Sequence, residues 1–114
     1  MARTTQSAAA AFDRALHAIE YRILRYRSSR GAFGPMVKDL ETLLRQIDDT
    51  PGFAVELRSK WQDLDEICAG LQRDGVMEPA GERQRIAEIV LSELVDLCRS
   101  RRASNAPAAL YRRR

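Results

Sequence analysis

The stretch DTPGFAVELRSKWQDLDEICAGLQRDG, from Asp49 to Gly75, decides the fold class. Its large apolar residues recur every three or four positions and share about 120° of a helical wheel, which indicates an amphipathic helix rather than a strand. This apolar stripe consists of Phe53, Leu57, Trp61, Leu64, Ile67, Cys68 and Leu71. Thr50 and Pro51 suit the cap and the first position of a helix, and Gly75 suits its end. The stretch therefore predicts a helix over residues 51–74.

The same helical spacing recurs on both sides of this stretch, and turns containing glycine and proline separate the segments. It predicts three further helices, at about 5–30, 35–48 and 79–102. Connections of about three to seven residues favour antiparallel neighbours in a bundle. The sequence therefore predicts an all-α protein, in which an antiparallel four-helix bundle over residues 1–102 is followed by a basic, mobile C-terminal tail over 103–114.

Length and apolar patterning limit the classes of protein. A chain of 114 residues forms one domain and is too short for separate cofactor and substrate domains. It contains no apolar run near the roughly 18 residues that a transmembrane helix needs. Asp13 and Arg14 interrupt the small-residue stretch near the start before a secretory apolar region forms. We therefore expect a cytoplasmic domain without a transmembrane segment.

The residues that carry most enzyme chemistry are sparse. His17 is the only histidine, which is too few for a helical di-iron site and leaves a zinc site short of ligands. Cys68 and Cys98 would lie about 16 Å apart along an antiparallel pair of helices, so we expect two buried, reduced thiols. Carboxylate pairs such as Asp63 and Glu66 fall on the polar sides of helices. We therefore expect no enzyme: no catalytic residue, metal site or cofactor, and no identifiable small-molecule substrate.

Charge is distributed unevenly along the chain. Residues 31–98 carry fourteen acids against seven basic residues, whereas 99–114 carry six arginines and no acid. Residues 1–30 carry six arginines against two acids. Basic ends of this kind typically contact nucleic acid, a membrane surface or an acidic protein. The candidate nucleic-acid or anion contacts are Arg14, Tyr21, Arg22, Arg25, Arg101, Arg102, Arg112, Arg113 and Arg114.

Two simpler interpretations of this charge pattern stay open. The basic ends could fold back onto the acidic middle of the chain and neutralise it. The excess of arginine over lysine could also reflect a genome rich in G and C rather than a function.

The fourth predicted helix carries apolar residues over about 180° of its wheel, the widest apolar face in the chain. Such a face must contact two or more neighbouring helices or a partner protein. The first predicted helix is longer than the second, so part of it lacks a neighbour to cover it. The candidate residues for a partner interface are Leu24, Ile89, Leu91 and Val95.

These observations favour a small helical interaction or regulatory module. It would bind a protein partner, or a second copy in a homodimer, through apolar surface of its first and fourth helices. The alternative is a nucleic-acid-associated protein with arginine-rich electrostatic arms. RNA is the better candidate there, because arginine beside tyrosine suits backbone contacts and base stacking.

Overall fold

The computed structural model of the protein describes residues 2–47 and 51–104. Within these ranges it contains four α-helices and one π-helical turn. They are α1 (Ala2–Arg25), η1 (Tyr26–Arg30), α2 (Phe33–Leu44), α3 (Pro51–Asp74) and α4 (Glu82–Ser104). The all-α prediction is confirmed, and the helix expected over 51–74 has those bounds. Most of the predicted tail, residues 105–114, lies outside the described residues.

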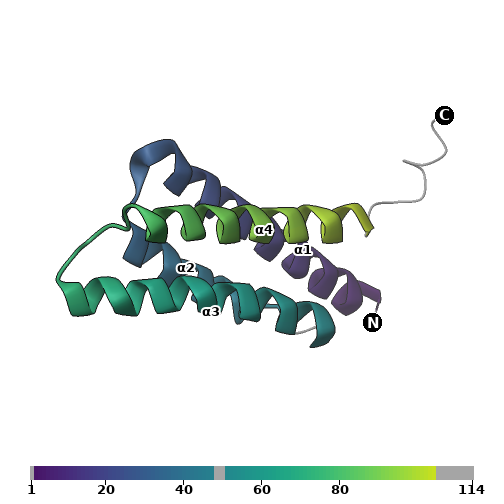
Figure 1. The fold of residues 1–114 in the computed structure, drawn as a ribbon. Helices are drawn as coiled ribbons and strands as arrows, with labels where there is room; N and C mark the ends of the chain where they lie inside the picture. The colour runs from purple at the N-terminus through teal and green to yellow at the C-terminus, as the bar shows by residue number, and fades with distance from the viewer. Residues whose placement is uncertain (1, 48–50, 105–114) are drawn as a thin grey trace.

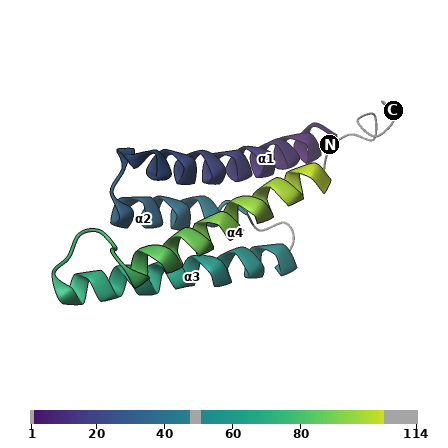
Figure 2. The ribbon, with the colours of Figure 1, turned by 45° about the horizontal axis from the view of Figure 1, so that its top comes forward.

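The four helices form an up-and-down bundle (Figures 1 and 2). Each helix packs against the next one in the chain, and α4 packs against both α3 and α1, which closes the ring. Successive helices run in opposite directions, so the C-terminal end of α4 lies beside the N-terminal half of α1. This arrangement confirms the predicted antiparallel four-helix bundle.

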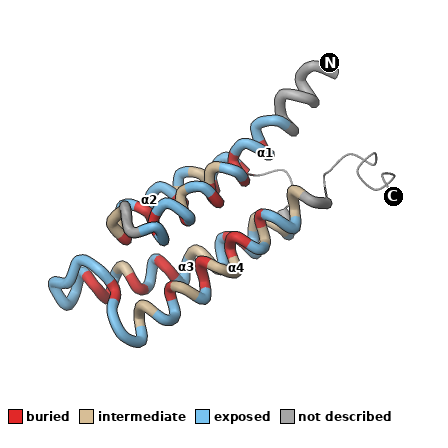
Figure 3. The backbone as a smooth tube through the Cα atoms, turned by 90° about the horizontal axis from the view of Figure 1, so that it is seen from above, coloured by how far each residue is buried: buried red, intermediate tan, exposed pale blue. Residues whose placement is uncertain are grey.

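The apolar stripes of the four helices meet inside the ring, as the buried positions in Figure 3 show. Every helix contributes side chains with almost no solvent exposure, among them Leu16, Ile19, Ile23, Phe33, Met36, Leu40, Leu57, Leu64, Leu91 and Leu94. An edge-on aromatic pair lies toward each end of the bundle. Phe12 contacts Phe53 with ring centroids 6.1 Å apart, and Tyr26 contacts Phe33 at 5.7 Å.

Two glycines with left-handed φ angles shape the connection between α3 and α4. Gly75, at φ 69°, ends α3. Its N–H donates to the Gln72 carbonyl at 3.2 Å, and the Val76 N–H donates to the Leu71 carbonyl at 2.9 Å. This pair of bonds is a Schellman motif, which favours glycine. Gly81, at φ 62°, interrupts helical geometry, so α4 begins at Glu82 and not at the predicted residue 79.

Ion pairs join neighbouring helices around the ring. The distances between paired atoms are 2.7 Å for Arg22–Asp39, 3.2 Å for Arg27–Glu88 and 3.0 Å for Lys60–Glu93. Both arginines belong to the basic first thirty residues, and their partners belong to the acidic middle of the chain. For Arg22 and Arg27, the structure therefore supports the interpretation in which the basic end neutralises acids of the body.

Glu20 is an acidic residue buried between α1 and α4. Its carboxylate accepts a hydrogen bond from Arg99 Nε at 3.2 Å and another from Arg102 Nη1. A buried carboxylate without a cationic partner is costly. The two arginines therefore hold the last turns of α4 against α1.

Candidate functional site

Three of the predicted anion contacts lie together on the outer side of α1. Arg14, Tyr21 and Arg25 are separated by seven and four residues, which places them on one helix face, and all three are exposed. Tyr21 is 64% exposed. Neither arginine forms an ion pair within the described part of the chain. Three of the four residues predicted for the basic face of this helix are therefore exposed together, and the fourth, Arg22, is not.

Other predicted anion contacts make intramolecular contacts instead. Arg22 pairs with Asp39, and Arg102 pairs with Glu20. The Arg101 guanidinium lies over the rings of Phe12 and Phe53, at 5.7 and 5.2 Å from their centroids.

Arg101 and Arg102, two of the candidate nucleic-acid or anion contacts, contact other residues of the bundle instead of projecting freely from it. Both belong to α4 and are half-buried, because α4 continues to Ser104 and packs beside α1. Arg112, Arg113 and Arg114 lie outside the described residues.

The four predicted partner-interface residues divide into two pairs. Leu24 and Ile89 are 43% and 54% exposed. Leu91 and Val95 are buried in the core, so the prediction that they contact a partner is wrong. The physical reason is the position of α4, whose wide apolar face is covered by α1 on one side and α3 on the other.

Leu24 borders the line along which α1 and α4 meet, whereas Ile89 is exposed on the outer face of α4. Leu24 lies four residues after Glu20 and three before Arg27, the two residues of this segment that pair with α4. It therefore occupies the same side of the helix. Ile89 lies four residues before Glu93, the partner of Lys60 on α3, so it lies on the outer face of α4 and away from α1. We call the exposed set Arg14, Tyr21, Leu24, Arg25 and Ile89 the α1–α4 surface.

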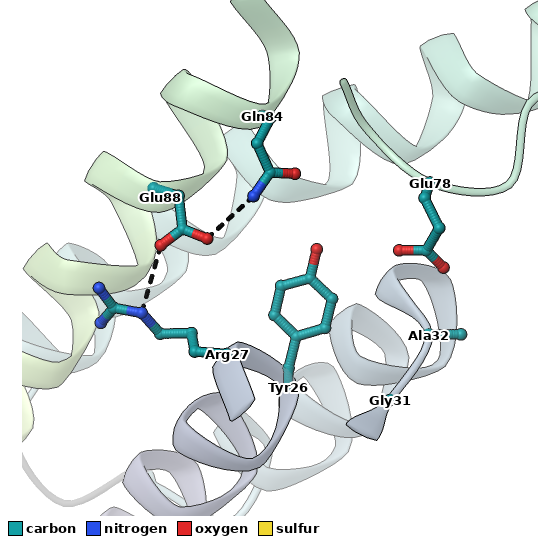
Figure 4. A pocket seen from close by; sticks show the side chains of 7 residues that line it. All are labelled: Tyr26, Arg27, Gly31, Ala32, Glu78, Gln84 and Glu88. Carbon is teal, nitrogen blue, oxygen red and sulfur yellow. Dashed lines mark hydrogen bonds and ion pairs between the residues drawn. The ribbon is translucent and has the colours of Figure 1, made fainter. Parts of the chain in front are cut away.

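A pocket of about 810 Å³ lies at the end of the bundle where α1 passes into α2. Figure 4 shows its lining residues, which are Tyr26, Arg27, Gly31, Ala32, Glu78, Gln84 and Glu88. We call it the Tyr26 pocket. The sequence did not reveal it, because its walls come from three separated segments that carry no common motif. The irregular spacing near the end of the first helix, where η1 forms, is a weak local signal.

Tyr26 supplies the central polar group of this pocket. Its residue surface is only 9% exposed, and its hydroxyl points into the space between Glu78 and the Gln84–Glu88 pair (Figure 4). The hydroxyl makes no hydrogen bond with another described residue. Burial, followed by the charges of Glu78 and Glu88, raises the pKa of Tyr26 from the usual 10.0 to about 12. The phenol is therefore protonated at neutral pH, and its oxygen can accept one hydrogen bond while its O–H donates another.

The two carboxylates of the Tyr26 pocket are held in position. The Phe33 N–H, at the start of α2, donates to the two oxygens of Glu78 at 3.1 and 3.3 Å. Glu88 accepts from Gln84 Nε2 at 3.0 Å and pairs with Arg27 Nε at 3.2 Å. The pocket thus carries two carboxylates against one guanidinium.

A second groove, of about 760 Å³, runs between α2 and α3. Trp61 lines it and donates its indole N–H to the Val37 carbonyl at 2.9 Å, so its polar group is already satisfied. Cys68 also lines the groove and is half-buried, where complete burial was expected. Burial and Asp65 raise the pKa of the Cys68 thiol, while Lys38 opposes them, so the thiol is a weak nucleophile.

Cys98 lies fully inside the core, and burial raises the pKa of its thiol to about 12. Both cysteines are free. His17 is exposed on α1, and across residues 2–47 and 51–104 no group of three or more histidine, cysteine or carboxylate side chains is placed to hold a metal ion. In those same ranges, none of the helices combines the length and apolar character needed to cross a membrane.

Comparison with known proteins found no match: no family model, no curated protein and no solved structure matches this chain.

Proposed function

We propose that this protein is a binding module that docks a protein partner through the α1–α4 surface. One observation carries the proposal: Tyr21, Leu24 and Ile89 are exposed on two adjacent helices. The buried apolar residues of those helices already pack against one another in the core, so these three side chains are not needed there. Apolar and aromatic side chains that are not used in the core are the usual centre of an interface.

The α1–α4 surface has rigid support. Two arginines of α4 hold the buried Glu20 carboxylate, and Arg27, three residues after Leu24, pairs with Glu88 of α4. These contacts keep α1 and α4 in one relative position. A surface that is already ordered loses less conformational entropy on binding, which favours its use as a docking site.

Charge indicates the chemistry of the partner. Arg14 and Arg25 flank Tyr21 and are exposed, so they favour a partner with acidic side chains around an apolar centre. A second copy of the chain fits less well, because a symmetric pairing centred on α1 would bring arginines of the two copies together. The expected partner is therefore a different protein.

Nucleic-acid binding is a second candidate, and it rests on Arg14, Tyr21 and Arg25. These residues span about 16 Å of helix, enough to follow a few phosphates of an RNA strand. The contacts of Arg22, Arg101 and Arg102 within the bundle reduce the number of arginines available for that role.

Site-specific photo-crosslinking tests the proposal. A photoreactive phenylalanine analogue replaces Tyr21 or Ile89 in the full chain, expressed at native level in the source cells. We expect both positions to give an adduct with the same acidic protein, because they belong to one surface. Leu24→Ser, introduced beside either probe, should reduce the adduct severalfold by removing a central apolar contact.

The matched control is the same analogue at Val55, an exposed apolar residue on α3. Adducts of equal yield from position 55, or adducts unaffected by Leu24→Ser, would contradict the proposal. A nuclease-sensitive adduct that weakens steeply with salt would favour the second candidate instead. An adduct of twice the chain's mass would favour self-association.

A further inference from the structure

The Tyr26 pocket has features of a ligand site that the α1–α4 surface does not use. Its volume of about 810 Å³ lies within the range of about 300–1,000 Å³ typical of small-molecule pockets. It is walled by the η1 corner, the connection before α4 and the first turns of α4. Ligand binding in the Tyr26 pocket is therefore independent of the proposed protein docking.

Tyr26 is a buried residue whose hydroxyl points into this space and makes no hydrogen bond with another described residue. The hydroxyl itself opens onto the pocket, where water can bond to it before a ligand binds. The ring itself is fixed against Phe33, with centroids 5.7 Å apart. The hydroxyl is thus held in place, and a ligand within the pocket can hydrogen-bond to it.

The surrounding charges select the ligand. Glu78 lies on one side of the hydroxyl, and Gln84 and Glu88 lie on the other (Figure 4). Arg27 neutralises Glu88 only, which leaves the pocket with an excess of negative charge. The same carboxylates that disfavour a phenolate at Tyr26 favour a cation beside it.

Both carboxylates can accept further hydrogen bonds from a ligand. Glu78 accepts from one backbone N–H, and Glu88 accepts from one amide and one guanidinium nitrogen. A carboxylate has about four lone-pair directions, so each has room for a further donor. Their existing bonds orient them before the ligand arrives.

We propose that the Tyr26 pocket binds a protonated amine or a guanidinium group, held by Glu78 and Glu88 with the Tyr26 oxygen accepting one of its hydrogen bonds. The group belongs either to a small free amine or to a lysine or arginine side chain of a peptide. Both sources present the same cationic head on an aliphatic stem.

Titration of the ¹⁵N-labelled full chain, followed by NMR, tests the proposal. The probes are the free polyamine spermidine and two blocked side chains, N-acetyl-lysine and N-acetyl-arginine methylamide. We expect saturable shifts of the Gly31, Ala32 and Gln84 amides with at least one probe. Preference for spermidine assigns the site to free amines, and preference for a blocked amino acid assigns it to peptide side chains.

Two variants locate the binding. Tyr26→Phe keeps the ring packing and removes the hydroxyl, and Glu78→Gln keeps an acceptor for Phe33 and removes the charge. Each should weaken binding about tenfold, as expected for loss of one charge-assisted contact. Glu66→Gln, which removes an exposed charge on α3, is the matched control and should leave affinity within about twofold.

Three results would overturn the proposal. One is the absence of saturable binding by every probe at millimolar concentration. Another is an equal loss of affinity in Glu66→Gln and Glu78→Gln, which would show a general charge effect. The third is unchanged affinity in both Tyr26→Phe and Glu78→Gln. Circular dichroism of each variant confirms that it is folded.

Discussion

The buried carboxylate of Glu20 on α1 accepts a hydrogen bond from the guanidinium of Arg102, 82 residues later on α4. Arg99 donates to the other oxygen of the same carboxylate. These two hydrogen bonds hold the first helix of the bundle against the last one. They also explain why the last turns of α4, although rich in arginine, stay packed against α1.

Arg102→Ala should destabilise the protein by about 2–3 kcal/mol, because Glu20 would stay buried with only the more exposed Arg99 as a partner. Chemical denaturation with urea measures the free energy of unfolding. Arg99→Ala is the matched control and should cost less than about 1 kcal/mol, since Arg99 is largely solvent-exposed. Equal effects of the two substitutions would contradict the assigned roles.

Glu78→Ala should loosen the start of α2. The Phe33 N–H would lose its acceptor, and the N-terminal end of the helix dipole would lose a negative charge, at a cost of about 1 kcal/mol. Hydrogen exchange followed by NMR should show faster exchange at the Phe33 amide than in the parent protein. The exchange rate of the Leu64 amide, in the middle of α3, should change only as much as the global free energy of unfolding changes. An unchanged rate at Phe33 would show that Glu78 does not cap α2.

Stability should fall as pH rises above about 9. Burial raises the pKa of Cys98 from 9.0 to about 12, and burial with Glu78 and Glu88 raises that of Tyr26 from 10.0 to about 12. For each group the folded state holds its proton more tightly than the unfolded state does. Its contribution is therefore complete below the unfolded pKa and is lost as pH rises toward the folded pKa.

Thermal unfolding between pH 8 and 11 measures this loss. Tyr26→Phe should make the decline above pH 10 shallower, because the substituted residue no longer titrates. The same substitution should remove the latest phase of tyrosine ionisation, followed by absorbance at 295 nm. A native protein in which all tyrosines ionise together would disagree with the buried position of Tyr26.

The two thiols should differ in reactivity. Cys68 lies at the edge of the α2–α3 groove, whereas Cys98 is enclosed by the core. In native protein, a disulfide reagent such as Ellman's should label Cys68 slowly and Cys98 only at the rate of unfolding. Cys68→Ala should abolish the first phase and leave the second. Rapid labelling of Cys98 would contradict its burial.

The sequence by itself determined the four helices and the inward face of each. Leu57, Leu64 and Leu71 recur at helical spacing, and all three are buried. That pattern is local, since a helix repeats every 3.6 residues whatever it packs against. The sequence also placed Arg14, Tyr21 and Arg25 on one exposed face, for the same reason.

The tertiary structure alone decided which residues meet across helices. Leu91 and Val95 lie on a face wide enough to serve either a core or a partner, and packing of α4 between α1 and α3 assigned them to the core. Likewise, Tyr26 meets Glu78 and Glu88 only because the bundle closes into a ring. Such contacts depend on neighbour order, helix offset and connection geometry. The periodicity of one helix carries no information about its neighbours, its offset or its connections. The Tyr26 pocket therefore could not be predicted from the sequence and is seen only in the folded structure.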